Sequence, residues 1–220
     1  MSAEPTGFLY PFIEADERDS SGLLADLAVS AVAKMQESRS LRAATLERCH
    51  DAIAQAGLAM AERFAAGGRL FAFGNGGSAT DADGTVHLFR VPPSGRPLPA
   101  MSLVDDRAVL TALSNDVGFE LVFSRQLIAH AHDGDIAVGF STSGDSINML
   151  NAFEEADRRG LLTVGLCGYE GAAMAVSDAV HHCLVVKSDS VHRIQEAQAA
   201  VMLAVWSSVQ RCLAGGREPR

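Results

Sequence analysis

DIAVGFSTSGDSINML, residues Asp135–Leu150, contains a buried strand, a polar turn and the start of a helix in direct succession. Residues 136–140 are apolar or glycine, a pattern typical of a parallel strand that is covered on both faces. The turn at residues 141–146 carries four small hydroxyl side chains and one glycine, and a helical pattern follows it. In an open α/β sheet, such a turn lies on the ligand side.

The hydroxyl-rich turn suits an anion. Backbone N–H groups at the start of a helix are unpaired, and the helix dipole favours negative charge there. Serine and threonine hydroxyls add donors without crowding a phosphate. The alternative is an ordinary capped turn, because Ser, Thr and Asp are common N-cap residues. The SxSxxS spacing between a buried strand and a helix favours phosphate binding.

Strand and helix patterns alternate along the rest of the chain. This order predicts an α/β protein with a doubly wound parallel sheet of about five strands, preceded by N-terminal helices. The predicted strands are 69–73, 100–104, 136–140, 161–167 and 182–186, and the main predicted helices are 23–35, 40–66, 105–113, 119–131, 147–159, 172–176 and 191–213. Ser40 is the expected cap of the second helix, and Asn115–Asp116 are expected to end the helix before them.

The length of 220 residues is enough for one large core. We therefore expect a single domain over residues 1–220. Within it we expect an extended arm at 1–21, a helical oligomerisation segment at 22–66 and an α/β core at 67–213.

Composition excludes several classes of protein. The net charge of −9 disfavours non-specific nucleic-acid binding. There is no CxxC pair, which argues against a zinc knuckle or a thioredoxin-like pair, and no two histidines have the HxxxH spacing of metal ligands. No basic segment precedes an apolar run near the start, and no apolar run is long enough to span a membrane. These features predict a soluble cytoplasmic protein.

A second loop, Gly74–Ser78, follows the first predicted strand. Its glycines would let the backbone pass close to a ligand. The spacing is not GxGxxG, and no acidic residue closes a following strand, so a dinucleotide site is disfavoured. The alternative is a tight strand-to-helix turn without a binding role.

Four motifs in one order resemble the sugar isomerase (SIS) domain, and within it the phosphoheptose isomerase group. They are GNGGS at 74–78, SND at 114–116, STSGDS at 141–146 and RIQE at 193–196. The resemblance covers about residues 41–213. It implies a flavodoxin-like three-layer α/β sandwich, a homotetramer and a phosphorylated sugar as ligand.

The resemblance also implies roles for individual residues. The phosphate would be held by Ser141, Thr142, Ser143 and Ser146. The sugar would be lined by Asn75, Gly76, Gly77, Ser78, Asn115, Asp116 and Gln195.

The acid–base and metal positions of the group differ in this chain. The group carries a His and, four residues later, a Glu on the helix after the glycine loop, and a second His eight residues after the RIQE glutamine. Here those positions are Gly84, Leu88 and Leu203. Zinc therefore stays open as a cofactor, but it would lack its usual ligands at these three positions, and we assign no residue as a metal ligand.

Other polar residues nearby could transfer protons in an isomerisation. His87 lies about 60° around the helix from position 84, and Glu196 follows the RIQE glutamine; these two are the catalytic candidates. Alternatively, His87 is a partly buried histidine and Glu196 a structural carboxylate paired with Arg193. Asp81, Asp83 and His192 are further polar candidates, although acids are favoured in a first helical turn by the dipole alone.

Two functions remain open. The first is an aldose–ketose isomerase that converts sedoheptulose 7-phosphate to D-glycero-D-manno-heptose 7-phosphate or acts on a similar sugar. The second is a non-catalytic sugar-phosphate sensor or protein-binding scaffold, similar to the DnaA-associating regulators of the same family.

Overall fold

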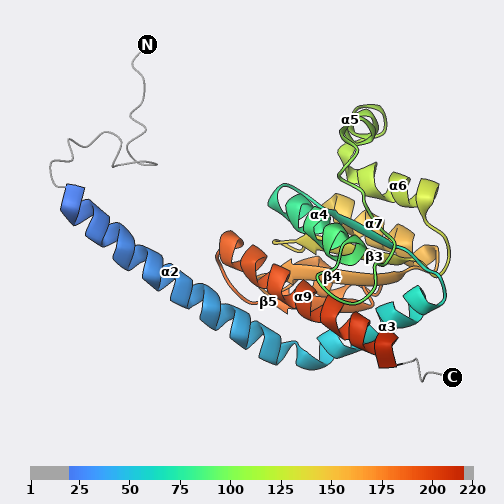
Figure 1. Ribbon diagram of the computed structural model, residues 1–220. Helices are drawn as coiled ribbons and strands as arrows, with labels where there is room; N and C mark the ends of the chain where they lie inside the picture. Colours follow the sequence, from blue (N-terminus) through green and yellow to red (C-terminus); the bar gives the residue numbers. More distant parts are fainter. Residues whose placement is uncertain (1–19, 216–220) are drawn as a thin grey trace, which may run out of the picture. The chain divides into compact units, whose positions relative to one another are not determined.

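The computed structural model describes residues 20–215, and these residues contain a five-stranded sheet with helices on both faces (Figure 1). The strands are β1 (Leu70–Gly74), β2 (Ala100–Ser102), β3 (Ile136–Ser141), β4 (Leu162–Gly168) and β5 (His182–Val186). The helices are α2 (Ser20–Arg48), α3 (His50–Ala65), α4 (Gly77–Arg90), α5 (Arg107–Asp116), α6 (Val122–His130), α7 (Ile147–Arg158), α8 (Ala172–Val176) and α9 (Val191–Gly215), with a short 3-10 turn, η2, at Phe119–Leu121.

All neighbouring strands are parallel, in the order β2-β1-β3-β4-β5. The predicted doubly wound α/β fold is therefore confirmed. The chain runs from β1 outward to β2 and then returns to the other side of β1 as β3. Since the strand order reverses there, the loops after β1 and β3 flank the topological switch point, where open α/β sheets bind their ligands.

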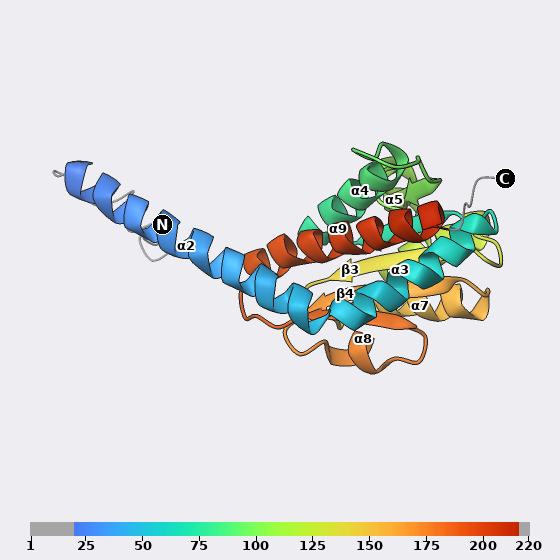
Figure 2. The same ribbon diagram turned by 60° about the horizontal axis from the view of Figure 1, so that its bottom comes forward.

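The sheet lies between two layers of helices (Figure 2), and an apolar cluster fills the space on each of its faces. On one face, α3, α4 and α9 pack on the sheet around fully buried residues such as Met60, Phe89 and Val205. On the other face, α6, α7 and α8 enclose a cluster that includes Phe73, Phe123 and Phe153. Strands β1, β3 and β4 are buried along their whole length, as the apolar runs predict.

The N-terminal helices differ from the prediction. We expected a helix boundary at Ser40, but α2 continues through it to Arg48, and the break falls at Cys49. Ser is tolerated inside a helix, and the sequence offers no strong breaker before that point. The chain divides into two compact units between Arg39 and Ser40. The expected arm lies almost entirely outside the described residues.

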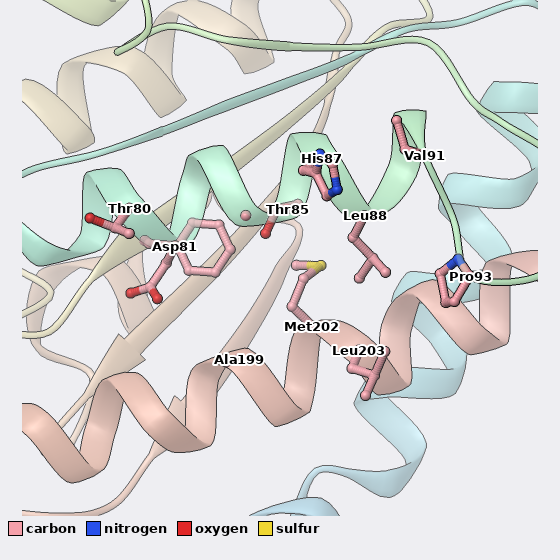
Figure 3. A pocket seen from close by; sticks show the side chains of 12 residues that line it. Thr80, Asp81, Thr85, His87, Leu88, Val91, Pro93, Ala199, Met202 and Leu203 are labelled. Carbon is pink, nitrogen blue, oxygen red and sulfur yellow. The ribbon is translucent and has the colours of Figure 1, made fainter.

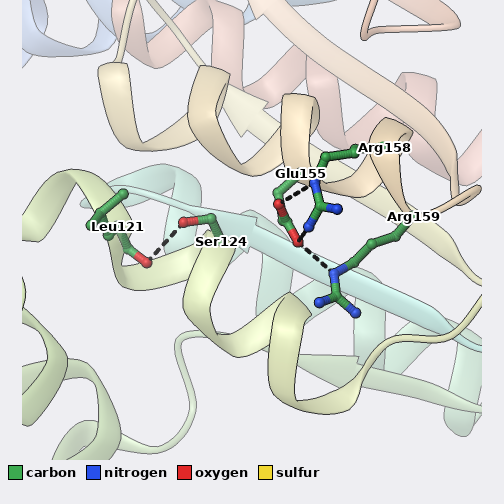
Figure 4. A network of polar contacts seen from close by, with 5 residues as sticks. All are labelled: Leu121, Ser124, Glu155, Arg158 and Arg159. Carbon is green, nitrogen blue, oxygen red and sulfur yellow. Dashed lines mark hydrogen bonds and ion pairs between the residues drawn. The ribbon is translucent and has the colours of Figure 1, made fainter.

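The end of α7 is fixed by an ion-pair network (Figure 4). Arg158 donates to both carboxylate oxygens of Glu155, at 3.0 and 2.6 Å, and Arg159 Nε donates to Oε1 at 2.5 Å. Burial acts to raise the pKa of Glu155, but the two guanidinium groups outweigh it and the pKa is lowered. On the neighbouring helix α6, Ser124 donates to the carbonyl of Leu121 at 3.1 Å.

Candidate functional site

The loop after β3 presents hydroxyl groups at the start of α7. Ser141 Oγ lies 3.5 Å from Ser143 Oγ and accepts a hydrogen bond from Gly144 N at 3.1 Å. Ser143 is exposed, whereas Ser141 is buried. Ser146 is the N-cap of α7, and within residues 20–215 its side chain makes no capping bond. The first turn of α7 therefore keeps donor capacity for an anion.

Backbone contacts hold this loop in place. Thr142 O accepts from Gly168 N at 3.0 Å, and Gly144 O accepts from Met174 N at 3.0 Å. Gly144 has φ +76°, and a Cβ there would lie 2.3 Å from Gly171 O, so only glycine suits the position. The carboxylate of Asp145 accepts from Ala173 N, the start of α8, at 3.0 Å. Asp145 is therefore held in place by α8.

The glycine loop after β1 is joined to the hydroxyl loop by a pair of side-chain amides. Asn75 Nδ2 donates to Asn148 Oδ1 at 2.8 Å, and Asn148 Nδ2 donates to Asn75 Oδ1 at 2.9 Å. Asn148 is in the first turn of α7 and is buried. The amide pair therefore ties the glycine loop to the first turn of α7, directly after the hydroxyl loop.

Gln195 of α9 lies against the glycine loop after β1. A Cβ on Gly77 would lie 2.3 Å from Gln195 Nε2, so Gly77 and Gln195 are in close contact. The same amide donates to Asp81 Oδ2 of α4 at 3.3 Å. Burial raises the pKa of Asp81, and the hydrogen bond from Gln195 offsets this only in part. A carboxyl of raised pKa beside a ligand loop is suited to proton transfer.

Two of the residues that were predicted to line the sugar lie on a different helix, α5. Asn115 and Asp116 are exposed in the last turn of α5, where Asn115 Nδ2 donates to Asp116 Oδ1 at 2.8 Å. We expected them to break that helix, which is wrong, since α5 includes both. Their role toward the sugar stays a prediction.

The two catalytic candidates are both exposed, and His87 lines the cavity that also includes Asp81, Gly84 and Leu88. His87 is exposed on α4 and not partly buried. Glu196 is exposed and paired with Arg193 at 2.5 Å, as expected for a structural carboxylate. Asp81 was only a minor candidate in the sequence, because its position in a first turn explained it. Its bond to Gln195, which is 114 residues away in the chain, is what the sequence could not reveal.

Comparison with known proteins agrees with this arrangement. The family model described as the SIS domain matches residues 35–168. The chain is 39% identical to the phosphoheptose isomerase of Solidesulfovibrio magneticus over 76% of this chain and 81% of that protein, and 42% identical to that of Roseiflexus sp. over 69% and 77%.

The chain belongs to the phosphoheptose isomerase family of SIS-domain proteins. The solved phosphoheptose isomerase of Neisseria gonorrhoeae has the same fold, with a TM-score of 0.78 and 31% identity, over 84% of this chain and 99% of that one. That of Francisella tularensis aligns with a TM-score of 0.77 at 29% identity. The family resemblance and the α/β fold inferred from the motifs are thus confirmed.

The three positions noted in the sequence line a cavity whose walls are mainly apolar but include Thr80, Asp81, Thr85 and His87. Gly84, Leu88 and Leu203 lie together on one cavity of about 560 Å³ between α4 and α9. Figure 3 shows Leu88 and Met202 pointing toward one another from the two helices, with Asp81 at one end. Gly and Leu offer no metal ligand. Among residues 20–215, no group of three or more His, Cys, Asp and Glu side chains is placed to hold a metal ion. Gly84, Leu88 and Leu203 therefore supply no ligand to zinc.

The same described residues include no helix that is both long and apolar enough to cross a membrane.

Proposed function

We propose that the chain binds a phosphorylated sugar, sedoheptulose 7-phosphate or a close relative of it, at the switch point between β1 and β3. The observation that carries this proposal is the Asn75–Asn148 pair, which holds the glycine loop against the hydroxyl loop. The phosphate would lie at the start of α7, against Ser141, Thr142, Ser143 and Ser146. The sugar would extend along Asn75, Gly76, Gly77 and Ser78 toward Gln195.

Phosphate recognition here would use neutral donors. Arg193, on the helix that carries Gln195, is engaged by Glu196, and the chain as a whole is acidic. Hydroxyl groups and backbone N–H groups at a helix start bind phosphate without a lysine or arginine. This mode makes affinity depend on loop geometry more than on net charge.

An isomerisation at this site would move a proton between adjacent carbons of the sugar. Asp81 is the carboxyl best placed for that transfer, because it is joined to Gln195 and its pKa is raised. His87 and Glu196 are more exposed than Asp81, and Glu196 is paired with Arg193. The proposed reaction is the conversion of sedoheptulose 7-phosphate to D-glycero-D-manno-heptose 7-phosphate.

The test is turnover of sedoheptulose 7-phosphate by the purified chain, with and without added zinc, followed by detection of the aldose. We expect product that disappears in Asp81→Asn and does not require zinc. Product formation that is unchanged in Asp81→Asn would refute the role of this carboxyl.

A second candidate function is binding without turnover, in a sugar-phosphate sensor or scaffold. The apolar side chains at positions 88 and 203 favour it, because they supply neither a base nor a metal ligand. Stabilisation of the chain by sedoheptulose 7-phosphate with no aldose formed under any metal condition would establish this second function in place of the first.

We also propose a homo-oligomer, as the resemblance to a tetrameric group implies. Within α2, Leu24, Leu27, Val32 and Met35 are more than half exposed. Large apolar side chains in such a row are typical of a surface that packs on another chain.

A further inference from the structure

Two cysteines on neighbouring strands lie with their sulfur atoms in contact. Cys167 Sγ of β4 is 3.4 Å from Cys183 Sγ of β5, and both thiols are free. In the strand register Cys183 is opposite Gly165 and Cys167 is opposite Val185, so the two cysteines are diagonal neighbours on one face of the sheet. A disulfide bond is about 2.05 Å long, so the two sulfur atoms have to approach by about 1.4 Å to form one.

The two thiols have different surroundings. Cys167 is fully buried in the apolar cluster on the α8 side of the sheet, whereas Cys183 is only partly buried on the edge strand β5. The hydrogen bond that Cys167 donates lowers the pKa of Cys183, although burial acts in the opposite direction. The same bond, together with burial, raises the pKa of Cys167. Cys183 is therefore the thiol that an oxidant in solution reaches first, and it has the greater thiolate character.

Cys167 is also next to a contact that holds the hydroxyl loop. It pairs in the sheet register with Ser141, and the following residue, Gly168, donates its N–H to Thr142 O at 3.0 Å. Since β4 lies between β3 and β5, a bond that draws Cys167 toward Cys183 draws it away from the loop after β3. Oxidation of this pair is thus in a position to change the geometry of the hydroxyl loop.

We propose that a peroxide converts Cys167 and Cys183 to a reversible disulfide, and that this bond loosens the hydroxyl loop and weakens the binding of a phosphorylated sugar. The effect on the sugar rests on the proposed function, whereas the disulfide itself does not.

The reaction has two steps. The thiolate of Cys183 attacks one oxygen of hydrogen peroxide, the O–O bond breaks, and the products are a sulfenic acid and, after protonation of the leaving hydroxide, one water. The sulfur of Cys167 then attacks the sulfenic sulfur to form the S–S bond, and its proton leaves with the displaced hydroxide as a second water. Two thiols and one peroxide thus give one disulfide and two waters.

Thiol counting and peptide mapping test the disulfide. The reduced, denatured chain has four free thiols. After treatment of the folded chain with hydrogen peroxide, we expect only Cys49 and Cys212 to remain free. Mass spectrometry should show one pair of peptides joined through Cys167 and Cys183, and dithiothreitol should separate them.

Isothermal titration calorimetry with sedoheptulose 7-phosphate measures the consequence for the loop. We expect the oxidised chain to bind at least about threefold more weakly than the reduced chain, because the hydrogen bond from Gly168 to Thr142 is weakened. Dithiothreitol should restore the affinity.

Variants separate the two thiols. Cys183→Ser should keep all its remaining thiols after peroxide, and its affinity should not change on treatment. Cys167→Ala removes the second thiol, so Cys183 should stop at the sulfenic acid, which dimedone labels. Cys212→Ser is the matched control, because Cys212 is also a partly buried free thiol but belongs to α9. It should form the disulfide as the parent does.

Four thiols that survive the peroxide, a bridge that includes Cys49 or Cys212, or a bridge between two copies of the chain would refute the thiol pair. A disulfide that leaves the affinity for sedoheptulose 7-phosphate unchanged would refute its effect on the hydroxyl loop. An equal loss of affinity in peroxide-treated Cys183→Ser would assign that loss to another residue. Absence of binding by the reduced parent would refute the proposed function instead, while the thiol count still tests the disulfide.

Discussion

Ser143 is the exposed hydroxyl of the loop after β3, and its hydrogen bonds within the described chain are long, at 3.5 and 3.4 Å. We expect Ser143→Ala to weaken binding of sedoheptulose 7-phosphate about tenfold, because a bond to a charged group contributes about 1.5–3 kcal/mol. Calorimetry measures this, and the melting temperature should stay nearly constant.

Ser188→Ala is the matched control for this change. Ser188 Oγ accepts from the backbone two residues later, as Ser143 Oγ does, but it lies outside the loop. Equal losses of affinity in the two variants would show that Ser143 has no special contact with the ligand.

The raised pKa of Asp81 leads to a prediction about how stability depends on pH. Burial raises its pKa in the folded chain above the unfolded value near 4. The folded state therefore favours the neutral carboxyl, and that stability is lost as the pH rises through the folded pKa. Asparagine is neutral at every pH, so the Asp81→Asn variant does not lose this stability as the pH rises.

The stabilising effect of Asp81→Asn should thus be larger at pH 7 than at pH 3.5. Melting temperatures of parent and variant across this range measure the difference. A gap that narrows as the pH rises would mean that the pKa of Asp81 is lowered, not raised.

At the scale of single residues, the sequence predicts the site only where local pattern determines it. Ser141, Ser143 and Ser146 follow from a strand, a turn and a helix that are contiguous in the chain. Asn148 and the Asp81–Gln195 bond depend on contacts between distant segments. Helix periodicity does not reveal such pairs.

At the scale of elements, the amide pair ties α7 to the loop before α4. Asn148→Ala leaves Asn75 without its partner and should cost about 1–3 kcal/mol in the free energy of unfolding. Urea titration measures this. The double variant with Asn75→Ala should lose less than the sum of the two single variants.

Additive losses in that cycle would show that the two amides act independently.

Glu155→Gln, at the other end of α7, serves as a comparison. It should lower stability mainly above the unfolded pKa of Glu, near 4.3, since the lowered pKa of Glu155 contributes stability there that is lost as the pH falls. It should not change ligand affinity.

Element boundaries show what local signals can and cannot determine. The strands were predicted within about two residues, because buried parallel strands are almost continuously apolar. The predicted start of the second helix was wrong. Ser40 is a residue type that often caps a helix, but here it lies inside an unbroken one. The prediction at Asn115–Asp116 was wrong for the same reason, because residue types that often end a helix also occur in its last turn.

At the scale of the whole molecule, α2 makes a prediction about assembly. We expect a mass in solution that is a multiple of 23.2 kDa. Leu24→Lys with Leu27→Lys should lower it, because charge on an apolar contact surface disfavours association. Multi-angle light scattering measures the mass.

Val176→Lys is the control for this change, since Val176 is 83% exposed and lies outside α2. A monomeric parent, or a mass that is unchanged in the α2 variant, would refute the predicted contact surface. The sequence could predict an apolar row here but not what covers it.

The binding of a phosphorylated sugar is tested most directly by calorimetry of the parent chain with sedoheptulose 7-phosphate and with unphosphorylated sedoheptulose. We expect one phosphorylated sugar per chain and at least about tenfold weaker binding of sedoheptulose, because in the proposed binding mode the loop after β3 holds the phosphate. Equal affinity for the two sugars, or no binding of either, would contradict a phosphate site at the start of α7.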